Sequence, residues 1–202
     1  MLYKIQKTDI VQASKVLTDA FQHDPLWNRV FEGEADKGKL FSAFFEVSVR
    51  YCLKYGEVYA PSEKLEGIIA FLPGKYADMN IWHMILSGAM WAGMRMGLKA
   101  GQKMGPIFEP FVADRHTHMA GRNFLYVMAV GVATALHGKG FGGRLLRAAM
   151  EKADAAGIPL YLETETEENV RMYEHLGFTM LKKITLPVIE VPMWEMVREP
   201  KS

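Results

Sequence analysis

Residues 124–143, FLYVMAVGVATALHGKGFGG, constrain the fold of this chain more than any other segment. The first half is rich in β-branched and aromatic residues, which favour a strand, and the second half is rich in glycine. An amphipathic pattern, RLLRAAMEKADAAG, follows without a break and predicts a helix that ends at Gly157. The sequence therefore predicts a strand, a glycine-rich loop and a helix in direct succession.

The loop has the composition of a phosphate-binding site. Four glycines, Gly138, Gly140, Gly142 and Gly143, lie at the start of the helix. Glycine lets successive backbone N–H groups turn into one hollow, and the first turn of a helix adds unpaired N–H groups and a positive dipole end. We expect the loop to bind an anion, most simply a phosphate. A turn that only changes the chain direction is the alternative.

Two common phosphate-binding patterns fit this loop poorly. A Walker loop is excluded because Lys139 is followed by glycine and no glycine lies five residues before the first glycine of the loop. The loop formally matches the dinucleotide-binding pattern GxGxxG, with Glu163 at the position of a ribose-binding acid. However, residues 133–137 separate the strand from the first glycine, where that pattern needs an immediate turn. Dinucleotide binding is therefore the runner-up.

Residues 132–142, VATALHGKGFG, resemble the acyl-CoA signature of the GNAT superfamily of N-acetyltransferases, V-x-P-x-x-[QR]-G-x-G-x-[GA]. Residues 162–178 are similar to the strand and helix that follow in that superfamily, and their L-E-T and Y-E-x-L-G-F wording resembles the branch containing puromycin N-acetyltransferase. The close resemblance covers about the last 80 residues. The chain departs from the signature at Thr134, where proline is common, and at His137, where glutamine or arginine is common.

The resemblance implies a single α/β domain, residues 1–202, with a GNAT-like fold. That fold has a mixed, mostly antiparallel central sheet with one parallel central strand pair and helices on both faces. Hydrophobic periodicity predicts strands at residues 2–5, 56–61, 66–72, 124–132, 158–164, 179–186 and 189–197. It predicts helices at residues 8–21, 37–55, 81–100, 106–115, 144–156 and 168–176.

A helical insertion of about residues 76–120 interrupts the superfamily pattern. Apolar residues dominate residues 81–100, but His83, Arg95 and Lys99 interrupt them, so a membrane span is not expected. We expect a buried helix that pairs with a second helix at residues 106–115. Its methionines suit core packing or a subunit contact, or a roof over the acceptor site.

Composition narrows the function classes. A net charge of +1 without a dense basic run argues against a nucleic-acid partner. The first residues lack an apolar signal core, so a cytoplasmic location is expected, and the single cysteine, Cys52, is expected to be buried and inert. No metal is expected, because His116 and His118 lack a nearby ligand set. No membrane partner is expected, and a homodimer is left open.

The resemblance also implies a chemistry: acetyl-CoA binds between the central strand and the next, and an amine attacks the thioester directly. Tyr173 is the expected general acid for the departing thiolate, and Glu163, directly or through water, is the expected base. The acceptor is expected to be a primary amine of a small molecule or peptide, drawn in by the acids around Glu163. The alternative is a non-catalytic acyl-CoA or nucleotide-binding sensor or interaction module.

Two groups of residues are expected around these ligands. By resemblance, Phe21, Trp27 and Phe31 are candidate walls of the acceptor cleft, although they could equally be ordinary core aromatics. The expected acetyl-CoA-binding residues are Val130, Val132, His137, Gly138, Lys139, Gly140, Phe141, Gly142, Gly143, Arg144 and Asn169.

Overall fold

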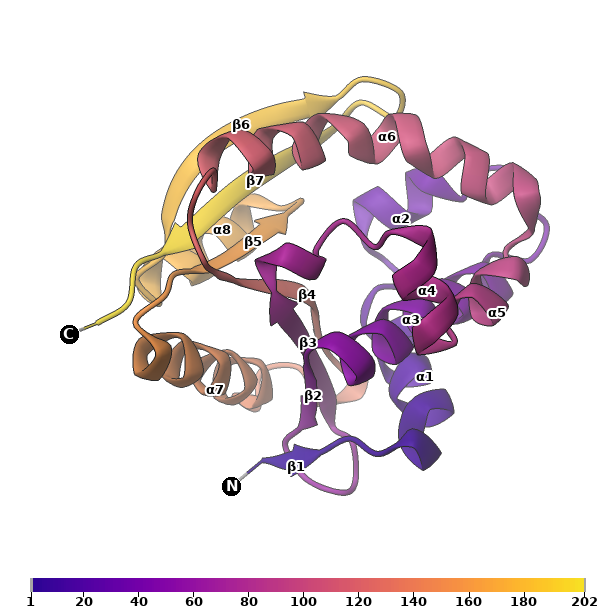
Figure 1. Ribbon diagram of the computed structural model, residues 1–202. Helices are drawn as coiled ribbons and strands as arrows, with labels where there is room; N and C mark the ends of the chain where they lie inside the picture. The colour runs from indigo at the N-terminus through magenta and orange to yellow at the C-terminus, as the bar shows by residue number, and fades with distance from the viewer. Residues whose placement is uncertain (1, 202) are drawn as a thin grey trace.

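The computed structural model describes residues 2–201, without the side chains of residues 98 and 99. Its described residues form one 7-stranded sheet in the order β1-β2-β3-β4-β5-β7-β6, with helices on both faces (Figure 1). The strands are β1 (Tyr3–Lys4), β2 (Glu57–Ala60), β3 (Gly67–Pro73), β4 (Leu125–Val132), β5 (Leu160–Thr164), β6 (Thr179–Leu186) and β7 (Val191–Arg198). The helices are α1 (Ile10–Ala20), α2 (Pro25–Val30), α3 (Lys37–Tyr55), α4 (Ile81–Ser87), α5 (Ala89–Met94), α6 (Gly97–His118), α7 (Phe141–Ala156) and α8 (Glu167–His175). Three short 3-10 helices are η1 (Lys7–Asp9), η2 (Gly74–Tyr76) and η3 (Thr134–Leu136).

The sheet confirms the predicted fold class. β4 and β5 are parallel, and the other neighbouring strands of the described sheet are antiparallel. This includes the expected hairpin of β2 and β3 and the final pair of β6 and β7. A doubly wound dinucleotide-binding domain needs a mostly parallel sheet, so this topology argues against the dinucleotide-binding alternative.

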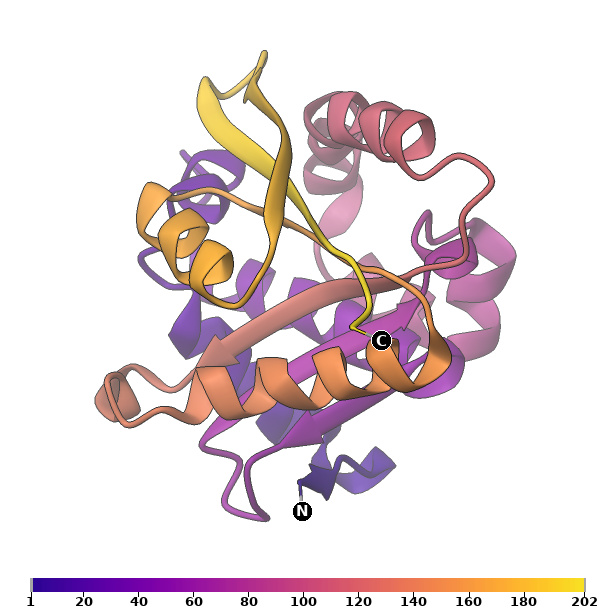
Figure 2. The same cartoon turned by 90° about the vertical axis from the view of Figure 1, so that its left-hand side faces the viewer.

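β4 and β5 pair only at their beginnings. The register joins Leu125 to Leu160 and Tyr126 to Tyr161, and no later pair joins these strands in the described sheet. β4 then continues to Val132 against β3. Figure 2 shows β6 and β7 turning away from β3 and β4. The two parts of the sheet therefore diverge towards the carboxyl ends of β4 and β5.

β3 shows how the sheet is buried on both faces. Ile68 and Leu72 belong to the core that α1 and α3 cover, whereas Ile69 and Phe71 belong to the core under α7. Side chains along a strand alternate between faces, so a strand covered on both sides has a continuous apolar sequence. This explains the run GIIAFLP of β3.

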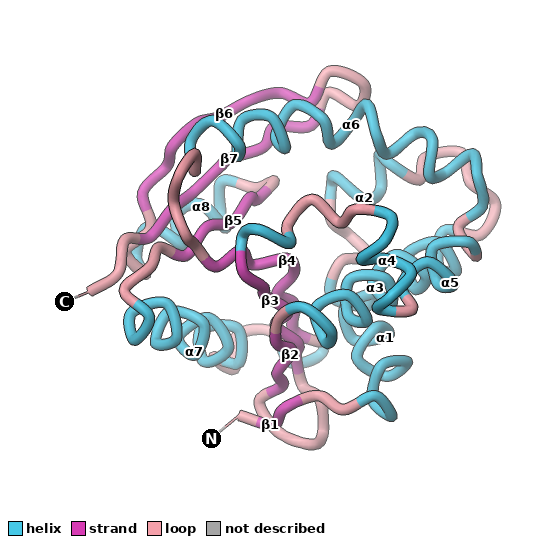
Figure 3. Tube along the Cα trace, in the orientation of Figure 1, coloured by secondary structure: helices cyan, strands magenta, loops and turns pink. Residues whose placement is uncertain are grey.

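The inserted segment differs from its prediction. A single buried helix over residues 81–100 and a second helix at 106–115 were expected, but the chain forms three helices, α4, α5 and α6, joined by short loops (Figure 3). Gly88 and Gly97 have left-handed backbone angles, with φ of 74° and 78°, and these angles separate the three helices. α6 runs through Pro106 and Pro110 instead of starting at the first of them. None of the residues of α4 is buried, so this helix is not a core helix.

The remaining helices follow the apolar periodicity of their sequences. α1 and α3 begin and end within two residues of their predicted bounds, and α3 carries Cys52 in the core, where burial raises the pKa of the thiol well above its usual value. The thiol is therefore protonated and enclosed, as expected for an inert cysteine. None of the helices within residues 2–201 combines the length and the apolar character needed to cross a bilayer.

Candidate active site

A cavity of about 810 Å³ opens where β4 and β5 diverge. β4, the glycine-rich loop and α7 form one side of it, and the end of β5 with α8 forms the other. Among the predicted site residues, those that line this cavity are Val130, Val132, His137, Gly138, Gly140, Phe141, Gly142, Gly143, Glu163, Asn169 and Tyr173. Lys139 and Arg144 are exposed and are not part of its lining.

The backbone of β4 presents N–H groups to the cavity. The N–H of Ala133 donates to the carbonyl of Glu66 on the β3 side, at 3.0 Å. Because successive residues of a strand point their N–H groups in opposite directions, Val130 and Val132 point theirs away from β3, towards the side that β5 has left. His137 lies on this side, since its Nε2–H donates to the Val132 carbonyl over 3.0 Å. This hydrogen bond holds the start of the loop against β4.

The loop forms a hollow of backbone N–H groups. Gly138 and Gly140 have left-handed φ angles of 75° and 78°. Residues that carry a Cβ adopt such angles only at a cost in free energy. The first backbone bond of α7 runs from the N–H of Arg144 to the carbonyl of Gly140, at 3.1 Å. The N–H groups of residues 141–143 come before it and have no carbonyl within the helix to bind. These donors fit the diphosphate of coenzyme A, so the residues present match the expected cofactor.

Tyr173 lies on α8 with its hydroxyl free to act. Its side chain is 5% exposed and its ring lies 5.4 Å from that of Phe178. Burial, followed by the charge of Glu165, raises the pKa of the phenol above its usual value. Within residues 2–201 the hydroxyl has no hydrogen-bond partner. It is not one of the fully enclosed polar atoms, so a ligand can reach it. The phenol is therefore protonated at neutral pH and open to the cavity.

Asn169 lies one helical turn before Tyr173 on the same face of α8. Its Nδ2 donates to Thr164 Oγ1 at the end of β5, over 3.1 Å. The N–H of Asn169 also donates to the side chain of Thr166, the N-cap of α8, over 3.2 Å. The first bond attaches the start of α8 to the end of β5, and the second caps the helix that carries Tyr173.

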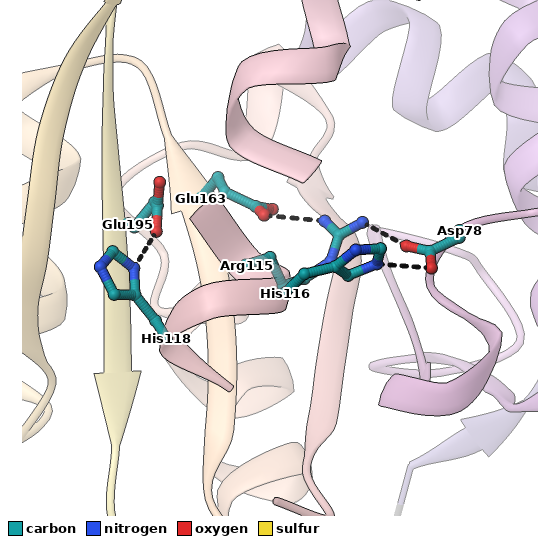
Figure 4. A network of polar contacts seen from close by, with 6 residues as sticks. All are labelled: Asp78, Arg115, His116, His118, Glu163 and Glu195. Atoms are coloured by element: carbon teal, nitrogen blue, oxygen red, sulfur yellow. Dashed lines mark hydrogen bonds and ion pairs between the residues drawn. The ribbon is translucent and has the colours of Figure 1, made fainter. Parts of the chain in front are cut away.

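Glu163 is not a free carboxylate. Its Oε1 lies 3.0 Å from Nη1 of Arg115, whose Nη2 lies 3.0 Å from Oδ1 of Asp78 (Figure 4). The Glu163 and Arg115 side chains are 7% and 3% exposed, and the hydroxyl of Tyr126 adds a hydrogen bond to Glu163. Burial raises the pKa of Glu163, and the Arg115 charge opposes that rise. The sequence analysis missed Arg115, because nothing in its local pattern distinguishes it from a solvated helix residue.

The two histidines considered as metal ligands lie in the same network. His116 pairs with Asp78 at 2.7 Å, and His118 pairs with the fully buried Glu195 at 2.7 Å (Figure 4). Glu195 is the cross-strand neighbour of Glu163 on the β5–β7 pair. The end of α6 thus places a cationic or ionisable side chain against each of two adjacent buried carboxylates on the sheet.

Asp24 and Glu165 lie in the cavity without a cation. Asp24 is the N-cap of α2, where it accepts from the N–H of Trp27 at 3.2 Å, and Glu165 follows β5. Burial raises the pKa of Asp24 to about 6, and burial together with the Asp24 charge raises the pKa of Glu165. In the part of the chain that the structure describes, neither carboxylate forms an ion pair, unlike Glu46 or Glu163. Nothing in the local sequence around Asp24 distinguishes it as a site residue.

Aromatic rings line the cavity beside these carboxylates. Phe21 and Trp27 do so as expected for candidate wall residues, with Phe44 and Phe45 of α3 next to them. The rings of Trp27 and Phe44 lie 4.0 Å apart. Phe31, the third candidate, is 1% exposed and lies in the core instead. This end of the cavity combines an apolar wall with two neighbouring carboxyl groups.

Comparison with known proteins shows similarity to acetyltransferases in sequence and in fold. The model of the Acetyltransferase (GNAT) family matches residues 100–178. An uncharacterised N-acetyltransferase of Schizosaccharomyces pombe is 27% identical over 208 residues, which cover 98% of this chain and 83% of the relative. The chain is thus similar in sequence to acetyltransferases of the GNAT family, and these matches do not single out the branch that contains puromycin N-acetyltransferase.

Solved structures show the same fold. An acetyltransferase from Corynebacterium glutamicum described as histone acetyltransferase HPA2 and related has a TM-score of 0.68 at 18% identity, covering 100% of this chain and 97% of its own. A polyamine N-acetyltransferase from Drosophila melanogaster, which forms N-acetylagmatine, has a TM-score of 0.62 at 17% identity and covers 98% of this chain and 99% of its own. Structures of this fold include complexes with acetyl-CoA and with CoA.

Proposed function

We propose that this protein transfers the acetyl group of acetyl-CoA to a primary amine of a small molecule or peptide by direct attack. The observation that carries the proposal is the cavity at the divergence of β4 and β5. It brings together the amides of the glycine loop, the outward N–H groups of β4 and the free phenol of Tyr173. Phosphate binding, carbonyl polarisation and proton donation are the three requirements of this reaction.

Each group has a defined role in the proposed reaction. The amides of residues 141–143 hold the diphosphate, and the N–H of Val130 or Val132 stabilises the oxyanion that forms when the amine attacks the thioester carbonyl. The C–S bond then breaks and Tyr173 gives its proton to the leaving thiolate. The proton that the attacking nitrogen loses as the amide forms returns to the phenolate through water. A phenol with a raised pKa holds its proton until the thiolate develops, so it is in the acid form at the start of each turnover.

The acceptor must lose a proton before it attacks. Because Arg115 already occupies Oε1 of Glu163, we propose that Glu163 takes this proton through a water molecule and not by direct contact. Burial raises the pKa of Glu163, which favours its taking up a proton, and the Arg115 charge opposes that rise and favours the carboxylate form that a base needs.

The acceptor is proposed to be a cationic amine. Asp24 and Glu165 are mostly screened from solvent and lack a counter-ion, so an ammonium group of the acceptor is the cation that this end of the cavity fits. The aromatic wall formed by Trp27 and Phe44 suits the carbon chain or ring that carries the amine. The relative that acetylates agmatine gives independent support for a small cationic acceptor.

A thiol-release screen tests the function. Purified protein with acetyl-CoA is expected to release CoA thiol with at least one amine of a panel of polyamines, agmatine, arylalkylamines, aminonucleosides, aminoglycosides and amino acids. Aminonucleosides are included because residues 162–178 resemble the puromycin N-acetyltransferase branch. If CoA raises the melting temperature but no amine gives turnover, the non-catalytic sensor is the correct alternative.

Asp24→Asn and Glu165→Gln are expected to lower kcat/KM for a cationic acceptor by about 10–100-fold, mainly through KM, because each removes one charged contact. Steady-state kinetics with the best amine of the panel measures this. Glu168→Gln, an exposed carboxylate on the same cavity, is the matched control and should change little. An unchanged KM in both variants would contradict the proposal that Asp24 and Glu165 bind the cationic acceptor.

The same variants have a stability signature. The folded-state pKa of Asp24 is raised from 3.8 to about 6, so the folded state binds this proton more tightly than the unfolded state does. The wild-type protein therefore loses stability as the pH rises through this window. Asp24→Asn keeps the N-cap and removes the charge, so its melting temperature at pH 7 should exceed that of the wild type.

A further inference from the structure

The inserted helices carry an unusual concentration of exposed apolar side chains. Among the described residues, six of the eleven exposed large hydrophobic side chains lie on α4 and α5, and Trp82 and Trp91 are each 71% exposed. We call this set the α4–α5 surface. Its members are Ile81, Trp82, Ile85, Leu86, Trp91 and Met94. Scattered exposed apolar residues are normal in folded proteins, but a gathering of this size on two adjacent helices usually marks an interaction surface.

The geometry of the helices directs these side chains outward together. Trp82 and Leu86 are four residues apart on α4 and share a face. Gly88, with its left-handed backbone, turns the chain so that α5 lies beside α4 on the outside of α3 (Figures 1 and 3). Ala89 and Ala92 provide the buried side of α5. None of the α4–α5 surface lines the cavity described above, so it is not part of the acceptor site.

The charged side chains within and directly after the α4–α5 surface in the sequence are cations. Residues 79–108 contain Arg95, Lys99 and Lys103 and no aspartate or glutamate. Glu46 of α3 has a side chain that is only 10% exposed and is shared by Arg50 and Arg95, which leaves this group with one excess positive charge. Lys103 pairs with Glu34 at 3.7 Å. The Arg95 side chain is 57% exposed. Exposed tryptophans close to an exposed arginine with an excess positive charge are typical of helices that lie in a membrane interface.

We propose that the α4–α5 surface binds the face of a bilayer that contains anionic lipid, with Trp82 and Trp91 inserted at the headgroup level. Each helix is too short to span a bilayer, so the contact is interfacial. A second copy of this chain is the less favourable occupant, because a two-fold contact would place the same cationic border against itself. This assigns a membrane-surface partner where the sequence analysis expected none. It is independent of the proposed function, since the surface shares no residue with the cavity.

The protein contains its own probe for this contact. Of its four tryptophans, Trp27 and Trp194 are 7% and 5% exposed, whereas the other two lie on the α4–α5 surface. Vesicles of phosphatidylcholine with phosphatidylserine should therefore shift the tryptophan emission of the full chain to shorter wavelength. Co-sedimentation with the same vesicles should show binding that weakens as salt is added, and vesicles of phosphatidylcholine alone should bind much less.

Two variants make the test specific. Trp82→Ser combined with Trp91→Ser should weaken binding to the anionic vesicles at least about tenfold, because two interfacial apolar side chains are lost. Val188→Ser combined with Met180→Ser, which changes exposed apolar residues elsewhere, should bind as the wild type does. An unchanged thermal shift with CoA shows that the tryptophan variant is folded. The proposal is overturned by equal binding of both variants, by no binding of the wild type, or by a wild-type dimer in light scattering that the tryptophan variant abolishes.

Discussion

Tyr173→Phe is expected to lower kcat by about 10²–10⁴-fold while the affinity for CoA stays unchanged. The substitution removes one oxygen atom from a side chain whose ring stays packed against Phe178. Because the hydroxyl has no partner among the described residues, its loss leaves no unsatisfied polar group behind, so the fold should be preserved. The effect should therefore be confined to the proton that the thiolate receives.

The kinetics separate this role from a structural one. If the phenol acts only in the transition state, kcat and kcat/KM should fall by the same factor with the best amine of the panel. A CoA titration followed by thermal shift should give the wild-type affinity. Tyr59→Phe is the matched control, since Tyr59 pairs with Glu57 outside the cavity. Equal loss in both variants, or full activity of Tyr173→Phe, would remove the phenol from the mechanism.

Arg115→Met is expected to destabilise the protein by about 3–5 kcal/mol, because it leaves the Glu163 carboxylate buried without its cation. For a chain of this size the melting temperature should fall by about 6–20 °C. The loss should be smaller at low pH. Without Arg115 the folded-state pKa of Glu163 rises further above the pKa of the unfolded chain. Stability is therefore lost as the pH rises from the unfolded-state pKa through the folded-state pKa. At lower pH the carboxyl is protonated and the stability returns.

A second substitution tests the cause. Arg115→Met with Glu163→Gln removes the buried charge, so the double variant should recover part of the stability that the single variant loses. Glu163→Gln alone should cost less, since Arg115 keeps its contact with Asp78 at 3.0 Å. Thermal or denaturant unfolding at two pH values measures all three proteins. A single variant as stable as the wild type, or a double variant less stable than the single, contradicts the ion-pair account.

Local sequence predicted the parts of the fold whose causes are local. The strand, loop and helix from β4 to α7 were predicted because β-branched residues, glycines and apolar periodicity influence the backbone conformation of their immediate neighbours. The pairing of Asn169 with Tyr173 on one face of α8 follows from helical spacing alone. The insertion was mispredicted because Gly88 and Gly97 were read as helix residues, whereas each adopts a left-handed turn.

The full set of residues that line the cavity could not be predicted from these patterns. Its glycine loop and Tyr173 were found from two motifs and their separation, whereas Asp24, Phe44 and Arg115 were not found. These residues come from α2, α3 and α6, and they reach the end of β5 only because the sheet divides there. No spacing rule relates residues that meet through the packing of separate elements.

By itself the sequence predicted the fold class, which the structure confirms, and it pointed to the glycine loop as the proposed anion site and to Tyr173 as the proposed acid, because strands, glycine turns and helix ends depend on neighbouring residues. Only the tertiary structure decided the electrostatics. It paired Glu163 with Arg115, left Asp24 facing Glu165 without a cation, and turned Trp82 outward. Whether a charge is neutralised or an apolar side chain is covered depends on what the rest of the chain places beside it, and contacts of that kind exist only in the folded molecule.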